Sequence, residues 1–195
     1  NKNPESMKHK EQVKSSFIGI GTDGKPVNMD LWKPTKRSDG WGLMSIMSSY
    51  EQEAVYDGGI DDDGRIVGKM PQYIYSEEEG RFKEVIYLYY TFYGCTGLRI
   101  APEIPGSVEY MDGTFAACTG LTTAPEIPNS VMSMYDTFSG CTNLTGEITI
   151  NANLNSSGGW NSCFWNTTKP IQLTGTCPIL SKLAETSKNG NVTVK

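Results

Sequence analysis

Apolar residues in the middle of the chain recur every three or four positions, in a stretch that cannot be one helix. Between positions 108 and 127 they are Val108, Met111, Phe115, Cys118, Leu121, Ala124 and Ile127. This spacing is typical of an amphipathic helix. Repeated glycines and prolines are incompatible with that helix, because proline removes a hydrogen bond and clashes with the preceding turn. The prolines are Pro102, Pro105, Pro125 and Pro128. The pattern therefore predicts a chain that winds in coils.

The pattern occurs three times, without gaps, at a spacing of 23 residues. Segments that begin at Thr91, Thr114 and Thr137 read T-F-Y-G-C-T-G-L, T-F-A-A-C-T-G-L and T-F-S-G-C-T-N-L. A fixed period is the sequence signature of stacked repeats, in which one unit buries too little apolar surface to fold alone. The columns predict a repeat core of Phe92, Cys95, Leu98, Phe115, Cys118, Leu121, Phe138, Cys141 and Leu144.

Weaker copies of the unit flank the three regular ones, which span 85–151. The alternating apolar segments predicted to be strands are 148–150, 171–173 and 192–194. Phe164 follows Phe138 by 26 residues rather than 23. We therefore expect the fourth unit to contain an insertion of three residues, most simply within 155–159.

Residues 15–65 show no such register and indicate a β-rich module. Two alternating segments, 17–20 and 27–32, flank a Thr-Asp-Gly turn and predict a pair of strands. A further apolar stretch follows at 42–50. The acidic segment at 75–81 is predicted to be a surface loop within a leading half-unit.

These patterns divide the chain into three parts. We expect a flexible tail at 1–14, a β-rich N-terminal capping module at 15–65 and a repeat domain at 66–194, with degenerate trailing coils at 152–194. A cap is expected because the first unit would otherwise leave its core face open. A freely tethered second domain is the alternative, although about 50 residues make a marginal domain on their own.

The repeat unit S-V-x-x-M-x-x-T-F-x-x-C-T-x-L-T-x-A-P-E-I-P resembles the BspA-like leucine-rich repeats of bacterial cell-surface and secreted proteins. The resemblance covers roughly 66–194 and weakens after Asn151. It implies a leucine-rich-repeat solenoid, α/β by family, with right-handed coils of about 23 residues, short parallel strands and a small helical turn around F-x-x-C. It also implies a role in adhesion or protein binding. Pro102 and Pro125 stand where a strand donor is wanted, so strand pairing there is expected to be poor.

Charge and composition argue against several classes of function. The net charge is −5, and no Lys or Arg occurs between Arg99 and Lys169, so nucleic acid is not expected as a partner. No apolar run approaches the roughly 20 residues of a transmembrane segment. The single histidine, His9, lies in the polar tail, which nearly excludes His-dependent triads and the common His-bearing zinc sites. Carboxylate, lysine and tyrosine chemistry stay open.

The cysteine column suggests a disulfide or a metal site. Cys95, Cys118 and Cys141 would lie about 4.8 Å apart in stacked units, within the range of disulfide Cα separations. In-register side chains point the same way, however, and zinc prefers clustered C-x-x-C pairs, which the sequence lacks. We therefore expect buried, reduced thiols and no cofactor or metal. Cys163 and Cys177 lie outside the column, and their pairing is left open.

Two groups of carboxylates are candidate sites. Asp57, with the run 61–63 and Gly64, lacks the alternating spacing and the trailing Glu of an EF-hand loop, so an acidic hairpin turn is expected. Glu103 and Glu126 match one unit apart. Because the third unit has no equivalent carboxylate, they are interpreted as a solvated edge rather than a catalytic pair.

Tyrosines gather on the side of the first units that is predicted to face away from the core. The candidate binding residues are Tyr87, Tyr89, Tyr90, Tyr110 and Tyr135. A stripe of tyrosines suits contact with a protein or a glycan, because each ring offers rigid apolar area and a hydroxyl group. The alternative is that the N-terminal module or the segment 72–84 packs over them.

Together these features predict a non-enzymatic, secreted or surface-displayed repeat protein that binds a protein or glycan, possibly host-derived. Any signal or anchor would precede Asn1. A structural spacer within a larger surface protein is the first alternative. An enzyme with a carboxylate site between the cap and the repeats is the second.

Overall fold

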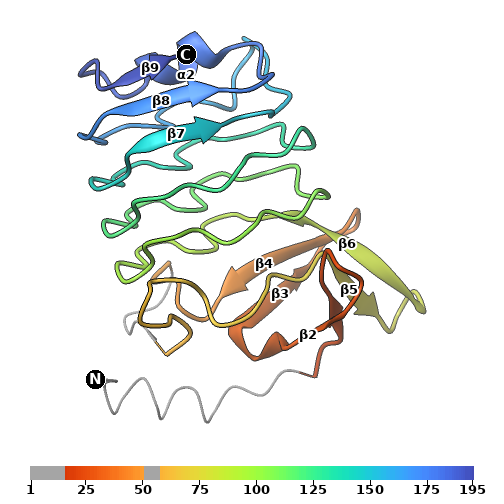
Figure 1. Ribbon diagram of the computed structural model, residues 1–195. Coiled ribbons are helices and arrows are strands. Elements are labelled where there is room, and N and C mark those ends of the chain that lie inside the picture. The colour runs from red at the N-terminus through yellow and green to blue at the C-terminus, as the bar shows by residue number, and fades with distance from the viewer. Residues whose placement is uncertain (1–15, 51–57) are drawn as a thin grey trace.

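The computed structural model describes residues 16–50 and 58–195, and the predicted flexible tail at 1–14 lies outside them. Figure 1 shows a curled sheet near the N-terminus, a column of turns rising from it, and a small parallel sheet at the C-terminal end.

The N-terminal sheet has six strands in the order β2-β1-β5-β6-β4-β3. Its elements are β1 (Gly19–Ile20), β2 (Pro26–Val27), the 3₁₀ helix η1 (Met29–Leu31), β3 (Trp32–Lys36), β4 (Trp41–Ser45), β5 (Tyr73–Ser76) and β6 (Arg81–Tyr87). Neighbouring strands are antiparallel except β4 and β6, which are parallel. The predicted pairing of 17–20 with 27–32 is confirmed in shortened form as β1 and β2. It ends early because the side chain of Asn28 caps η1 by accepting a hydrogen bond from the Asp30 amide.

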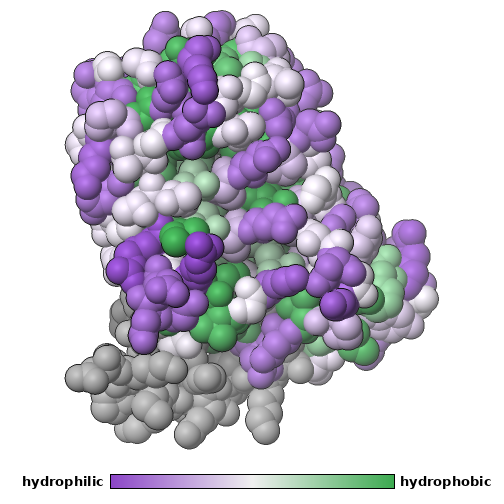
Figure 2. Space-filling model, viewed as in Figure 1, coloured by the Kyte–Doolittle hydropathy of each residue, from purple (hydrophilic) through white to green (hydrophobic). Residues whose placement is uncertain are grey.

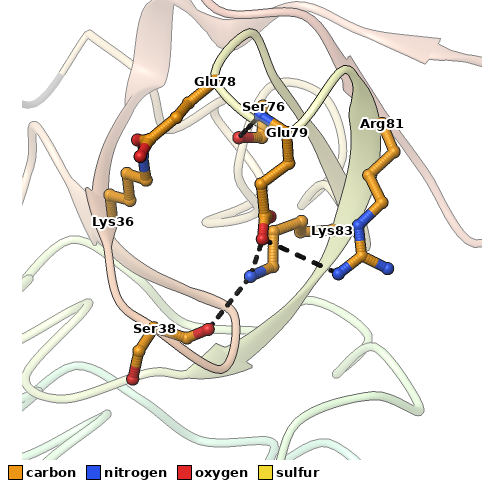
Figure 3. A network of polar contacts seen from close by, with 7 residues as sticks. All are labelled: Lys36, Ser38, Ser76, Glu78, Glu79, Arg81 and Lys83. Atoms are coloured by element: carbon orange, nitrogen blue, oxygen red, sulfur yellow. Dashed lines mark hydrogen bonds and ion pairs between the residues drawn. The ribbon is translucent and has the colours of Figure 1, made fainter.

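The acidic segment predicted to be a surface loop is confirmed as one at residues 77–80, the exposed turn of the β5–β6 hairpin. This turn is tied to the β3–β4 hairpin (Figure 3). Lys83 donates to the Ser38 carbonyl at 3.1 Å and pairs with Glu79 at 3.0 Å. Lys36 pairs with Glu78 in the same turn. These contacts hold the two hairpin ends of the sheet against each other.

A parallel three-stranded sheet of β7 (Gly146–Thr149), β8 (Ile171–Thr174) and β9 (Val192–Val194) lies at the other end, beside α2 (Leu180–Glu185). All three segments predicted to be strands contribute to this sheet. Their inward residues, including Ile148, Ile171 and Val192, are buried.

The expectation of a leucine-rich-repeat solenoid, with parallel strands and helical turns in each coil, is wrong. The described residues form a mixed six-stranded sheet and a parallel three-stranded sheet, with helix only in η1 and α2. Between 88 and 145 no strand forms, and the strand-type pairing between units is limited to isolated bridges such as Ile100 with Thr123. Proline is part of the reason, because Pro102 and Pro125 cannot donate to a ladder. In the third unit Ile148 takes the place of Pro125, and it lies in β7.

Successive 23-residue units are nevertheless joined by a regular set of backbone hydrogen bonds. The amide of Phe92 donates to the carbonyl of Thr114, 22 residues later, and the bonds on either side of it keep this offset. In the fourth unit the offset is 25, as in the bond from Phe138 to Cys163. The predicted insertion of three residues is thereby confirmed.

Phenylalanines form the centre of this column. The ring centroids of Phe92, Phe115, Phe138 and Phe164 lie 5.4, 5.7 and 5.4 Å apart in near-parallel stacks. Trp32 of β3 meets the first ring edge-on, at 5.8 Å and 83°, and so closes the column toward the N-terminal sheet. The other columns pack around them, and all nine residues assigned to the repeat core are at most 2% exposed.

Side chains also bond each unit to the one before it. Thr114 donates to the Leu88 carbonyl at 2.7 Å, and the Cys118 thiol donates to the Phe92 carbonyl at 3.0 Å. Thr137 and Cys141 repeat these bonds one unit later. The T-F-x-x-C motif therefore supplies two donors that fix each unit on its neighbour.

In the first unit the same donors reach into the N-terminal module. Thr91 donates to the Leu43 carbonyl at 2.7 Å, and Cys95 donates to the Met47 carbonyl at 3.3 Å. Leu43 and Met47 thus accept from the first unit the hydrogen bonds that Leu88 and Phe92 accept from the second unit. Leu43 precedes Leu88 by 45 residues, and Met47 precedes Phe92 by the same number, whereas the repeat period is 23. Because the two segments also share no motif, this equivalence is not visible in the sequence.

Each of the first four units contains two residues in the left-handed region, two positions before and two positions after its core phenylalanine. The first position is held by Tyr90 (φ 53), Gly113 (64), Asp136 (55) and Ser162 (57). The second is held by Gly94 (69), Ala117 (58), Gly140 (77) and Asn166 (60). Glycine takes this conformation without steric cost, whereas other residues are disfavoured by about 1–2 kcal/mol.

Ala117→Gly should therefore stabilise the fold by about 0.5–1 kcal/mol, since relief of left-handed strain exceeds the added entropy of the unfolded chain. Urea unfolding measures the change. The control is Ala116→Gly at the adjacent buried residue, which has no positive φ and should lose about 1 kcal/mol. Equal losses in the two variants would contradict the prediction.

All five cysteines are buried free thiols, so Cys163 and Cys177 are not paired. Burial disfavours the thiolate and raises the pKa of Cys95 and of Cys141 to about 12. The native state therefore holds these protons more tightly than the unfolded chain does. The free energy of unfolding therefore keeps its full value with respect to these two thiols below about pH 8.5, and it falls as the pH rises from about 9 toward 12.

Cys141→Ala should remove one of these groups. Between about pH 8.5 and 10, its free energy of unfolding should fall by about 1–1.5 kcal/mol less than that of the wild type. Urea unfolding under reducing conditions at several pH values tests this. Ser139→Ala in the same turn should keep the wild-type slope, and a wild-type slope in Cys141→Ala would refute the burial argument.

Candidate binding face

Tyrosines from the end of β6 and the units after it lie side by side. Tyr87 and Tyr110 are joined by a parallel bridge, and their rings stack at 4.8 Å and 9°. The ring of Tyr89 lies 5.2 Å from Tyr87 and 6.1 Å from Tyr110. We call the surface formed by Tyr50, Tyr87, Tyr89, Tyr90, Tyr110, Asp112, Tyr135 and Asp136 the tyrosine face.

The N-terminal module covers one end of the tyrosine face with residues that the sequence did not indicate. The Arg37 guanidinium lies 4.4 Å from the ring centroid of Tyr87 and 5.3 Å from that of Tyr89. The Tyr87 hydroxyl donates to Asp39 at 2.7 Å, which together with desolvation raises the pKa of Tyr87 to about 12. These contacts form a cation–π cluster supplied by the chain itself.

A second contact comes from Tyr50, whose ring stacks on Tyr90 at 4.1 Å and 5°. A pocket of about 320 Å³ opens beside these rings, between the β3–β4 hairpin and the first unit. Its lining includes Arg37, Tyr50, Tyr87, Tyr89 and Tyr90. No register links 15–65 to the repeats, so no pattern in the sequence could have brought Arg37 or Tyr50 to this place.

The other end of the face holds two carboxylates. Asp112 is half-buried, and one of its oxygens accepts hydrogen bonds from the Ser133 hydroxyl and from the Tyr135 amide, the latter at 3.3 Å. Burial raises the pKa of Asp112, and burial with the charge of Asp112 raises the pKa of Asp136. Within residues 16–50 and 58–195, neither carboxylate forms an ion pair.

These two aspartates could have been found in the sequence. Asp112 stands in the column of Tyr89 and Tyr135, and Asp136 stands in the column of Tyr90. Reading those columns for any polar side chain, rather than for tyrosine alone, would have placed both carboxylates on the same side of the repeats.

The five candidate tyrosines differ in exposure. Tyr87, Tyr89, Tyr90 and Tyr110 are half-buried, and Tyr135 is 41% exposed. The N-terminal module covers part of the first group, through Arg37 and Tyr50, and none of the described aromatic rings contacts Tyr135. The face is therefore partly closed at its N-terminal end and open around Tyr135.

The other carboxylate groups serve local structure. The Asp61 side chain accepts from the amides of Asp63 and Arg65 in its own turn, and Asp57 lies outside the described residues. Glu126 accepts from Asn151 at 3.0 Å. In the part of the chain that the structure describes, no three His, Cys, Asp or Glu residues are grouped as metal ligands.

The surface viewed in Figure 2 mixes hydrophilic and hydrophobic residues, and no single apolar area runs over the whole column on that side. No helix within the described ranges is long and apolar enough to cross a bilayer.

No protein-family model matches the chain, and no curated protein matches it. A crystal structure of a leucine-rich repeat protein from Bacteroides ovatus is similar, with 16% identity and a TM-score of 0.41 over 84% of this chain. The match covers 51% of that protein, so the present chain spans about half of its length. At this identity and TM-score, the likeness supports no inference about activity or partners.

Asp39→Ala should lower the pKa of Tyr87 from about 12 toward its ordinary value near 10, because the carboxylate accepts a hydrogen bond from the neutral phenol and repels the phenolate. NMR titration of the tyrosine Cζ resonances follows this residue. Asp61→Ala, in a distant acidic turn, should leave the Tyr87 titration unchanged. An unshifted Tyr87 in Asp39→Ala would show that another group sets its pKa.

Proposed function

We propose that this protein is a non-enzymatic, secreted or surface-displayed repeat protein that binds a macromolecular partner through the tyrosine face. The observation that carries the proposal is the clustering of tyrosines and two carboxylates on one side of the repeats, where neither carboxylate forms an ion pair with a described residue. Tyrosine is enriched among the residues that dominate binding energy, since it adds rigid contact area at low entropic cost. The resemblance of T-F-x-x-C-T-x-L to BspA-like repeats supports an adhesive role outside the cell.

An enzymatic role is less well supported by the same residues. Asp112 uses one oxygen to accept hydrogen bonds from Ser133 and Tyr135, which fixes the turn between units. The tyrosine face as defined contains neither His nor Cys, and the five cysteines of the chain are buried in the core. A spacer role predicts that substitutions on the tyrosine face leave every interaction unchanged.

The test is a binding screen of the intact chain against host matrix proteins and glycans, followed by Tyr135→Ala. Because Tyr135 is the exposed tyrosine of the uncovered end, its loss should weaken binding by about tenfold or more, while stability changes by less than about 0.5 kcal/mol. Surface plasmon resonance and thermal unfolding measure the two effects.

The matched control is Phe82→Ala, which removes an aromatic ring of similar exposure, 40%, from the β5–β6 hairpin. It should leave affinity within about twofold. Equal loss in both variants, or no loss in Tyr135→Ala, would contradict a binding role for the tyrosine face.

A further inference from the structure

We infer that the partner of the tyrosine face is a protein segment that presents exposed Arg or Lys side chains, which bind between Tyr135 and the carboxylates of Asp112 and Asp136. This inference rests on the proposed function and names the chemical class of its partner.

The chain already shows how this kind of surface holds a cation. At the covered end, the Arg37 guanidinium lies over Tyr87 and Tyr89, and Asp39 binds the Tyr87 hydroxyl. Tyrosines and a carboxylate thus surround one cationic group. At the open end, one tyrosine, Tyr135, lies with two carboxylates, but none of the described Lys, Arg or His residues pairs with those carboxylates.

The units that carry the open end cannot supply the cation themselves. No Lys or Arg occurs between Arg99 and Lys169, a stretch that includes both aspartates and Tyr135. Both carboxylates are also partly desolvated, and the pKa of each is raised for that reason. A cation from a partner would restore favourable interactions to these charges at low local dielectric, where such pairs are stronger than in water.

Ring packing favours a cationic protein segment over a glycan. Sugars stack on open aromatic faces, but Tyr87 is stacked on Tyr110 and covered by Arg37, and Tyr90 is stacked on Tyr50. Tyr135 is the member of the face whose ring meets no other described ring. A neutral glycan would also leave the two desolvated charges without a counter-ion, and an anionic glycan would be repelled.

The experiment measures binding of a short labelled peptide that alternates Arg with Ser, by fluorescence anisotropy at low and high salt. The wild type should bind this peptide and should bind the same peptide with Gln in place of Arg at least about tenfold more weakly. High salt should weaken the Arg peptide selectively, since the contact is electrostatic.

The Asp112→Asn, Asp136→Asn double variant should bind the Arg peptide at least about tenfold more weakly. Asparagine can still accept the hydrogen bonds of Asp112, so folding should be retained, and thermal unfolding checks this. The matched control is Glu103→Gln with Glu126→Gln, which removes the same two charges from the A-P-E-I-P segments. Its affinity should stay within about twofold of the wild type.

Equal affinity for the Arg and Gln peptides, no measurable binding, or equal loss in the two double variants would overturn the inference. If a neutral or acidic protein, or a glycan, instead binds and is lost in Tyr135→Ala, the cationic partner is wrong while the proposed function stands. If no ligand responds to Tyr135→Ala, the proposed function itself fails.

Discussion

The backbone hydrogen bonds between successive units are the constraint on which the rest of the structure depends. Buried turns need partners for their N–H and C=O groups as much as strands do. Here each unit satisfies them in the next one, at an offset of 22 residues, with Thr and Cys side chains adding further donors. The phenylalanine stack and the tyrosine face follow from this register. An insertion is tolerated at 155–159, where it lengthens an exposed turn and merely changes the offset.

The sequence predicted the period, the core columns and the insertion, because one residue per unit must fill the same space. It did not predict the backbone within a unit. The family resemblance implied strands and helical turns, yet Pro102 and Pro125 remove strand donors and left-handed residues such as Ala117 interrupt any helix. Arg37 and Tyr50 reach the tyrosine face through long-range contacts that no local pattern encodes, namely the pairing of β4 with β6 and the hydrogen bonds between the segment 43–49 and the first unit.

Two residues of the tyrosine face, Tyr90 and Asp136, adopt the left-handed backbone conformation. Tyr90 and Asp136 occupy the position that Gly113 holds in the unit between them, and each adopts it at a steric cost that glycine avoids. Both side chains belong to the tyrosine face. Residues in costly conformations persist where their surroundings hold them, and such residues cluster at functional sites. The turn that joins one unit to the next is thus also the element that displays the side chains proposed to bind.

The contact of Thr91 and Cys95 with Leu43 and Met47 has a consequence for how the molecule is made. The N-terminal part of a chain leaves the ribosome first and folds first. Once β4 and the turn after it have formed, the carbonyl groups of Leu43 and Met47 act as a template for the first unit, and that unit becomes the template for the second. Folding can therefore advance in the direction of translation, and each new unit adds to an ordered surface rather than having to nucleate one.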